Sequence, residues 1–235
     1  SLELGGKSPQ VVLSSAGNLE AVAESVASTI FWNSGQVCTA GSRLIVHERH
    51  AEEILARLTQ HAAAIEIGDP LDPHTSHGPL ASAAQLDRVE SIVSDSLESG
   101  SRVLVGGTRS AALPAGFGYN PTVLADGARD GPSRQEIFGP VLTVATFRGN
   151  DEALRLANDT DYGLAAYVWA GEVAEGYRFA SGLHCGSVNV NPSSDSPPEL
   201  LGVGFEPARA SGFGTEGGLA GLQSYTRVRT ITLGL

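Results

Sequence analysis

Residues 11–46 read VVLSSAGNLEAVAESVASTIFWNSGQVCTAGSRLIV, and this stretch decides the fold class. The apolar run at residues 11–13 has the composition of a short buried strand. Apolar side chains then recur at helical spacing over residues 19–31, with Asn18 placed as the N-cap. A second apolar run at residues 44–46 completes a strand–helix–strand unit. Alternation of this kind predicts an α/β fold.

The same alternation continues to both sides of the Cys38 region and predicts a mostly parallel sheet with helices on both faces. Residues 110–134 are rich in proline and glycine, and residues 192–209 form a long polar stretch. The first stretch is predicted to be rich in loops and the second to be one long loop, and loops as long as the second are usually functional. The further predicted elements are helices at residues 51–65, 82–99, 150–157 and up to 181, and strands at 103–105, 141–147, 165–169 and 187–190.

Composition narrows the class of protein. With 235 residues, 41% hydrophobic and 17% charged, the chain can bury a core and is not of the disordered type. Its net charge of −11, with scattered basic residues, argues against nucleic-acid and anionic-membrane partners. It contains neither an apolar run of about 18 residues nor a signal-peptide pattern. We therefore expect a cytoplasmic protein whose two cysteines are free thiols.

Two segments carry the chemistry. Cys38 lies among small residues in GQVCTAGSR, residues 35–43, where a substrate carbon has room to approach the thiol. Taken alone, a cysteine is more often an inert buried residue. Glu3 lies in LELGGKSP, residues 2–9, between apolar neighbours and a glycine turn. Burial raises a carboxyl pKa toward the range that suits a general base, so the two segments together suggest a nucleophile and its base.

Both segments resemble the active-site signatures of the aldehyde dehydrogenase superfamily. The separation between Glu3 and Cys38, 38 − 3 = 35 positions, also agrees with that family. Further matching segments follow in the family's order, so the resemblance covers nearly the whole chain. They are HGPL at 77–80, PTVL at 121–124, EIFGPV at 136–141, NDTDYGL at 158–164, GSVNVN at 186–191 and SGFGTE at 211–216.

The resemblance implies roles for individual residues. Cys38 would attack an aldehyde to give a thiohemiacetal and, after hydride transfer to NAD or NADP, a thioester that water activated by Glu3 would hydrolyse. Glu136 would hold the nicotinamide ribose, Phe138 would pack beside the nicotinamide, and Leu4 would be a further cofactor contact. Without the IFGP context, a solvated carboxylate and a core ring would be the commoner interpretations.

The resemblance also implies a substrate side and an assembly. Phe205 falls where the family has an aromatic residue lining the aldehyde tunnel, although Glu206 and Pro207 replace two glycines beside it. Residues 1–215 would form the catalytic domain, and residues 216–235 a tail with an oligomerisation strand. The expected partners are a small-molecule aldehyde and, in the full-length parent protein, further copies of the same chain.

Several alternatives stay open. The chain begins two residues ahead of Glu3 and lacks a glycine-rich phosphate loop, so it is either part of a longer parent or a truncated homologue. A non-catalytic assembly or binding module is a second possibility. A CoA-acylating aldehyde dehydrogenase is a third, but it typically lacks the carboxylate at Glu3. Cys185 is predicted to be a small core residue on a strand, with His184 facing the opposite side. The histidine spacing predicts no metal site.

Overall fold

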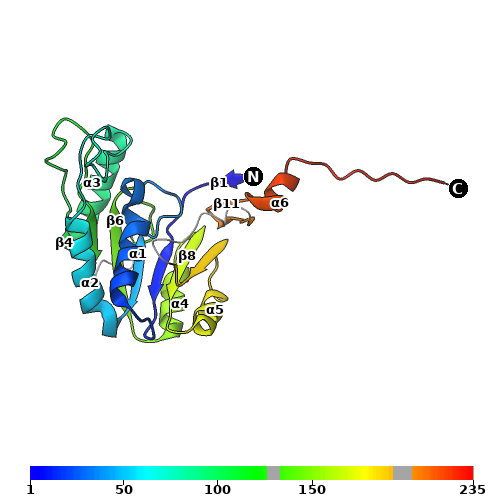
Figure 1. Ribbon diagram of the computed structural model, residues 1–235, viewed down its shortest axis with the longest axis horizontal. Coiled ribbons are helices and arrows are strands. Elements are labelled where there is room, and N and C mark those ends of the chain that lie inside the picture. The colour runs from blue at the N-terminus through cyan, green and yellow to red at the C-terminus, as the bar shows by residue number, and fades with distance from the viewer. Residues whose placement is uncertain (126–132, 193–202, 235) are drawn as a thin grey trace.

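The structure, a computed structural model, describes residues 1–125, 133–192 and 203–234 and is built on a seven-stranded sheet (Figure 1). Its neighbouring strands are all parallel except for the first pair, β4 and β5. The prediction of a mostly parallel α/β fold is thereby confirmed. In spatial order the strands are β4 (Arg102–Val105), β5 (Thr122–Ala125), β6 (Val141–Phe147), β3 (Arg43–His47), β2 (Pro9–Val12), β8 (Ala165–Trp169) and β9 (Ser187–Val190).

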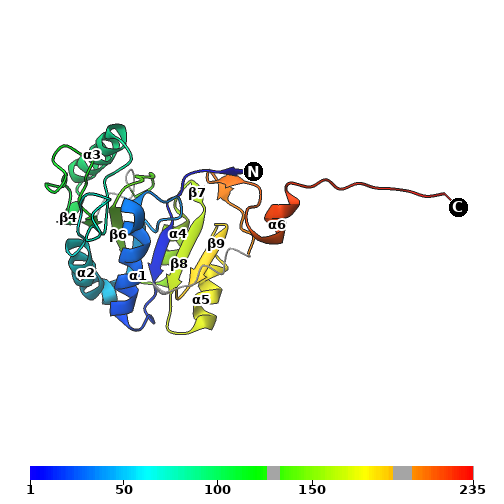
Figure 2. The ribbon, with the colours of Figure 1, turned by 45° about the horizontal axis from the view of Figure 1, so that its top comes forward.

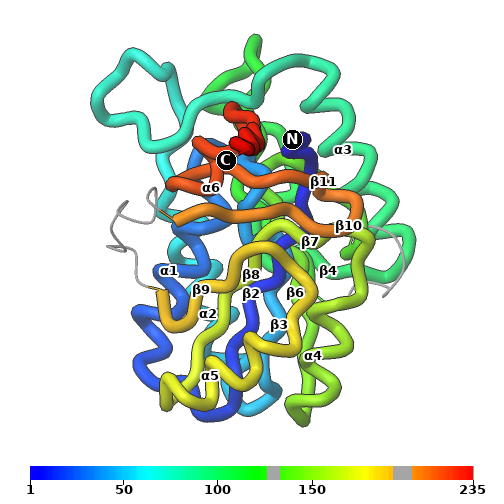
Figure 3. Tube along the Cα trace, turned by 90° about the vertical axis from the view of Figure 1, so that its right-hand side faces the viewer, coloured from blue at the N-terminus to red at the C-terminus, as the bar shows by residue number. Residues whose placement is uncertain are grey.

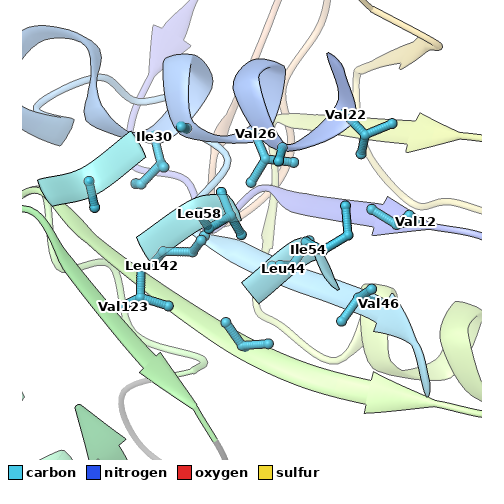
Figure 4. Close-up of a cluster of buried hydrophobic side chains, with 14 of the residues drawn as sticks. Val12, Val22, Val26, Ile30, Leu44, Val46, Ile54, Leu58, Val123 and Leu142 are labelled. Carbon is cyan, nitrogen blue, oxygen red and sulfur yellow. The ribbon is translucent and has the colours of Figure 1, made fainter. Parts of the chain in front are cut away.

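Helices cover both faces of this sheet. On one face, α1 (Leu19–Phe31) and α2 (Glu48–Ala63) bury apolar side chains against alternate residues of β2, β3, β5 and β6, as Figure 4 shows. On the other face lie α3 (Ala83–Glu98), α4 (Asn150–Asn158) and α5 (Val173–Ala180). Burying each of these large side chains contributes roughly 1.5–3 kcal/mol, so both faces stabilise the sheet.

Short strand pairs lie at the end of the sheet where the chain begins. The β1 strand (Leu2–Glu3) pairs with β11 (Gly212–Phe213), and β7 (Tyr162–Gly163) pairs with β10 (Ala208–Arg209). Figure 3 shows β7, β10 and β11 gathered at the same end as the N-terminus, and Figure 2 shows that the strands β2, β8 and β9 lie side by side below them. Segments from opposite ends of the chain therefore meet at one end of the sheet.

Most predicted elements have their expected positions, with a few corrections. The α1 helix begins after Asn18, whose side chain accepts a hydrogen bond from the Ala21 amide at 3.3 Å. Residues 110–134, predicted to be rich in loops, also contain the unpredicted strand β5. The helix predicted at residues 150–157 is α4, which begins at Asn150 and has Gly149 as its N-cap residue. Much of the long polar loop predicted at residues 192–209 falls at 193–202, outside the described residues.

The chain ends in α6 (Gly218–Gln223) followed by an extended segment, residues 225–234, that runs away from the body (Figure 1). Within this single chain the segment pairs with no described strand, and Val228 is 101% exposed. The predicted oligomerisation strand needs a second chain and so stays a prediction. Within the described residues, none of the helices combines the length and the apolar character needed to cross a membrane.

Candidate active site

Three predicted site residues precede three neighbouring strands. Glu3 lies shortly before β2, Cys38 before β3 and Glu136 before β6. The spatial order of these strands is β6-β3-β2, and all are parallel. Because parallel strands begin at the same edge of a sheet, the segments that lead into them converge there. The topology thus brings together residues that are up to 133 positions apart (136 − 3 = 133).

The thiol of Cys38 is half-buried in a tight turn closed by a hydrogen bond from the Ala40 amide to the Val37 carbonyl, 3.0 Å. Burial raises the pKa of this thiol, and the backbone amides of Thr39 and Cys38 itself partly offset that effect. The carboxylates of Glu3 and Glu136 lie close enough to raise the pKa further. A raised pKa disfavours the thiolate, so Cys38 must lose a proton before it can act as a nucleophile.

The glycine pair after Leu4 allows the three segments to touch. A side chain at Gly6 would collide with the carbonyl of Cys38, and one at Gly5 would collide with the carboxylate of Glu136. The Gly6 amide donates to Glu136 Oε1 at 3.0 Å. The two glycines therefore let the backbone that follows Glu3 approach both of the other site residues.

Glu3 is held in place by contacts with a distant part of the chain. It pairs with Gly212 in the β1–β11 ladder, and the next residue, Leu4, donates its amide to the Ser211 carbonyl at 2.9 Å. Burial raises the pKa of the Glu3 carboxyl, as the sequence predicted, and the charge of Glu216 raises it further. Its Oε1 atom is buried with no hydrogen-bond partner among the described residues. Both features suit a group that exchanges a proton with a bound molecule.

The loop that carries Glu136 and Phe138 is fixed from α3. Gln85 Nε2 donates to the carbonyls of Ile137 and Phe138 at 2.9 and 2.8 Å, and Arg88 donates to the Glu136 carbonyl at 2.8 Å. Phe138 adopts the left-handed conformation, with φ of 56°, and its ring is 38% exposed. A carboxylate that can accept hydroxyl hydrogen bonds, beside an open aromatic ring, fits the ribose and ring of a nicotinamide nucleotide.

Phe205, predicted to line the substrate tunnel, lies beside a residue to which the sequence assigned no role. Its backbone exchanges hydrogen bonds of 2.9 and 3.0 Å with Glu216. Glu216 in turn raises the pKa of Glu3, so Phe205 is on the same side of the site as the predicted base. Glu216 is part of the segment SGFGTE. Its electrostatic effect on Glu3, however, depends on the long-range pairing of β1 with β11.

Two further residues of the signatures, Lys7 and Arg43, are basic side chains buried next to the site. Arg43 donates to the carbonyls of Lys7, Leu156 and Ala157 at 2.9, 2.9 and 2.7 Å, which ties the Cys38 segment to the Glu3 segment and to the end of α4. Burial, and secondarily Arg43, lowers the pKa of Lys7 to about 7. The Lys7 Nζ atom has no hydrogen-bond partner among the described residues.

Cys185 differs from the prediction. It and His184 precede β9 rather than lying within a strand, and the thiol is half-buried beside the apolar cluster under α4 and α5. Its Sγ contacts the Ser187 carbonyl at 3.4 Å, and burial raises its pKa to about 11. Cys185 and Lys7 both line a small cavity of about 10 Å³. Among the described residues there is no group of three or more His, Cys, Asp or Glu side chains suited to a metal ion.

Comparison with known proteins agrees with this geometry. A sequence model of the aldehyde dehydrogenase family matches residues 1–231. The chain belongs to the aldehyde dehydrogenase family. It is 42% identical over 233 residues to "Aminoaldehyde dehydrogenase 1, peroxisomal" from Malus domestica, a match that covers 99% of this chain and 46% of that protein. It is 39% identical to betaine aldehyde dehydrogenase from Bacillus subtilis, covering 98% of this chain and 47% of the relative.

Solved structures show the same relationship for this aldehyde dehydrogenase chain. The aldehyde dehydrogenase KauB from Pseudomonas aeruginosa superposes with a TM-score of 0.91 at 36% identity, over 97% of this chain and 46% of that one. An aldehyde dehydrogenase from Bacillus cereus, solved with NAD+, gives a TM-score of 0.90 at 36% identity, over 97% and 45%. The chain thus spans about half the length of the relatives it matches.

Proposed function

We propose that this chain supplies the catalytic half of an enzyme that oxidises an aldehyde to a carboxylic acid with NAD or NADP. The observation that carries the proposal is the convergence of Glu3, Cys38 and Glu136 at the edge of the sheet where β2, β3 and β6 begin. Both carboxylates act on the pKa of the Cys38 thiol, so the three side chains form one electrostatic unit. Membership of the aldehyde dehydrogenase family supports this reading of the geometry.

In the proposed reaction Cys38 forms and breaks a bond to the substrate, and Glu3 moves a proton. Cys38 releases its proton to solvent, its thiolate forms a C–S bond to the aldehyde carbon, and the backbone amide of Cys38 stabilises the resulting oxyanion. The nicotinamide cofactor, when bound, supplies the acceptor for the hydride that leaves this carbon. Cys38 then carries a thioester. Glu3 takes a proton from water, the water oxygen attacks the thioester carbon, and the C–S bond breaks to release the acid.

Three residues would hold the cofactor on this half of the protein. The Glu136 carboxylate would accept hydrogen bonds from the nicotinamide ribose, and the exposed ring of Phe138 would pack beside the nicotinamide. Leu4, half exposed directly after Glu3, would be a further contact.

The raised pKa of Glu3 supports its assignment as the base, because a carboxyl with a higher pKa takes a proton from water more readily.

The substrate we propose is an aldehyde that carries an ammonium group. Phe205 and Glu216 are directly opposite each other in an antiparallel bridge, which puts their side chains on the same face, and an aromatic ring together with a carboxylate suits a cation. Relatives at 42% and 39% identity are named aminoaldehyde and betaine aldehyde dehydrogenases, which agrees with this class.

The test measures turnover by the parent protein, with this chain joined to its cofactor-binding half. An ω-amino aldehyde is compared with the neutral aldehyde of equal length, with NAD or NADP, and with or without CoA. We expect free carboxylic acid without CoA, and a higher kcat/KM for the amino aldehyde. A strict need for CoA would favour the CoA-acylating alternative. Absence of turnover with intact folding would favour the non-catalytic module.

The remaining assignments concern assembly and location. We propose that residues 1–215 act as the catalytic domain and that residues 216–235 carry an oligomerisation strand of a homo-oligomeric parent. The exposed apolar side chains of Tyr225, Val228 and Ile231 support this, because a second chain would bury them. We propose a cytoplasmic location, although several relatives are named as peroxisomal and one as chloroplastic. Fluorescence microscopy of the tagged parent tests the location.

A further inference from the structure

A tyrosine outside the two signatures contacts the nucleophile's loop. Tyr167 lies on β8, which pairs with β2, and its hydroxyl donates a hydrogen bond of 3.0 Å to the carbonyl of Thr39. Thr39 directly follows Cys38, although 128 positions separate it from Tyr167. The ring packs against the apolar cluster under α1 and α2, so the phenol has a fixed direction. No role in the reaction proposed above involves this residue.

Of the two backbone amides that act on the Cys38 thiol, that of Thr39 has the larger effect. It acts on the Cys38 sulfur and lowers the pKa of the thiol against the effect of burial. Cys38 and Thr39 occupy the two central positions of the turn closed between Val37 and Ala40. The amide and the carbonyl of Thr39 lie in adjacent peptide planes that meet at its Cα, so holding the carbonyl inside a turn closed from Val37 to Ala40 limits how far the amide can rotate.

The rest of the loop is held from other elements. The Gln36 side-chain oxygen accepts from the Ala81 amide at 2.9 Å, and Gln10 Nε2 donates to the Gly41 carbonyl at 2.6 Å. These contacts fix the two flanks of the turn. The Tyr167 phenol contacts the turn itself, one residue from the sulfur.

We propose that Tyr167 is a positioning residue for the nucleophile: its phenol holds the Thr39 carbonyl and so aims the Thr39 amide at the Cys38 sulfur. The inference rests on the proposed role of Cys38. Burial raises the pKa of the Tyr167 phenol to about 12, so it remains a donor throughout the range in which Cys38 is used. The other titratable groups that act on Cys38 are Glu3 and Glu136, and Tyr167→Phe changes neither.

The test compares Tyr167→Phe with the unchanged chain and with Tyr119→Phe. Tyr119 is also a buried phenol, but it lies in the separate cluster under α3. The rate at which iodoacetamide labels Cys38 is measured by mass spectrometry across pH. In Tyr167→Phe we expect a midpoint at higher pH and a rate at neutral pH reduced about three- to ten-fold, the effect of one lost hydrogen bond. Tyr119→Phe should keep the original profile.

Two outcomes would overturn the proposal. One is a Cys38 profile in Tyr167→Phe that matches the unchanged chain. The other is faster labelling of both Cys38 and Cys185, because that pattern means a loosened core rather than a misdirected amide. Failure of the proposed function looks different: Cys38 of the unchanged chain would then react no faster than Cys185, whatever the effect of Tyr167→Phe.

Discussion

Cys38 and Cys185 are both half-buried thiols that lie shortly before strands of one sheet, yet their surroundings differ. Cys38 leads into β3, which has β2 and β6 on its two sides. Cys185 leads into β9, which is at the edge of the sheet and pairs only with β8 among the described strands. Two flanking strands bring Glu3 and Glu136 to Cys38, whereas Cys185 contacts its own neighbour Ser187.

The comparison shows which surroundings a buried thiol needs in order to serve as a catalytic nucleophile. Burial raises the pKa of both thiols, so desolvation by itself does not make a thiol catalytic. The two thiols differ in how many other segments lie next to them. A strand in the middle of a parallel sheet has a neighbouring strand on each side, and the segments that lead into both neighbours lie at the same edge. A strand at the side of the sheet has only one such neighbour. The predictions below test this difference.

The largest expected effect is on turnover by the parent protein. Cys38→Ser should reduce kcat/KM by at least ~10³-fold, because the sulfur forms the covalent intermediate. Cys185→Ser is the matched control and should change kcat/KM by less than about two-fold. Steady-state kinetics of both variants provides the comparison. Equal losses in the two variants would contradict the distinction between the thiols.

Glu3→Gln tests one of the flanking segments. We expect thioester hydrolysis to slow by about 10²-fold while hydride transfer changes less, because the base acts after the acyl-enzyme forms. Pre-steady-state measurement should then show a burst followed by a slow steady rate. Loss of the burst with a normal steady rate would exclude Glu3 as the deacylation base. The control is Glu90→Gln, which removes a carboxylate on α3 that pairs with Arg109.

The pH dependence of this step follows from the raised pKa of Glu3. The base must be ionised, so hydrolysis should slow as pH falls through the raised pKa, at a higher pH than for an ordinary glutamate. In Glu3→Gln the residual rate should lack this acid limb. A pH–rate profile of the steady rate measures both. An acid limb that survives in Glu3→Gln would mean that another group controls it.

Alkylation of this chain gives a smaller effect. Iodoacetamide should label Cys38 roughly ten-fold faster than Cys185, since the thiolate is the reactive form and two backbone amides favour it at Cys38. Labelling of Cys185 should rise with pH toward its pKa of about 11, and labelling of Cys38 should rise at lower pH. Native mass spectrometry after brief exposure separates the two. Preferential labelling of Cys185 would refute the choice of nucleophile.

The smallest effect on the site is expected from the tail. Removing the residues after Ser224 should make the parent monomeric while its activity per subunit stays within about two-fold, because the extended segment runs away from the body that contains the sheet (Figure 1). Light scattering measures the mass. Replacing Arg227 and Arg229 by Gln keeps the apolar side chains and should preserve the oligomer. An unchanged mass after truncation would show that the tail is not the oligomerisation strand.

The sequence by itself determined the elements whose signals are local. Apolar spacing and the Asn18 cap predicted α1, and buried apolar runs predicted β2, β3 and β6. Strand–helix alternation then implied a parallel sheet, because parallel neighbours need crossover helices. The signature segments, by resemblance, indicated Glu3, Cys38 and Glu136 before any contact between them was known.

Only the tertiary structure decided the features that depend on distant partners. The β5 strand lies in a stretch rich in glycine and proline, and it is stabilised by pairing with β4 and β6 rather than by a local pattern. The two-residue pair of β1 with β11, which brings Glu216 to Glu3, is too short to leave any periodicity. The Tyr167 hydrogen bond to Thr39 likewise leaves no trace in either local sequence. Such contacts arise from strand order and register, which only packing of the whole sheet determines.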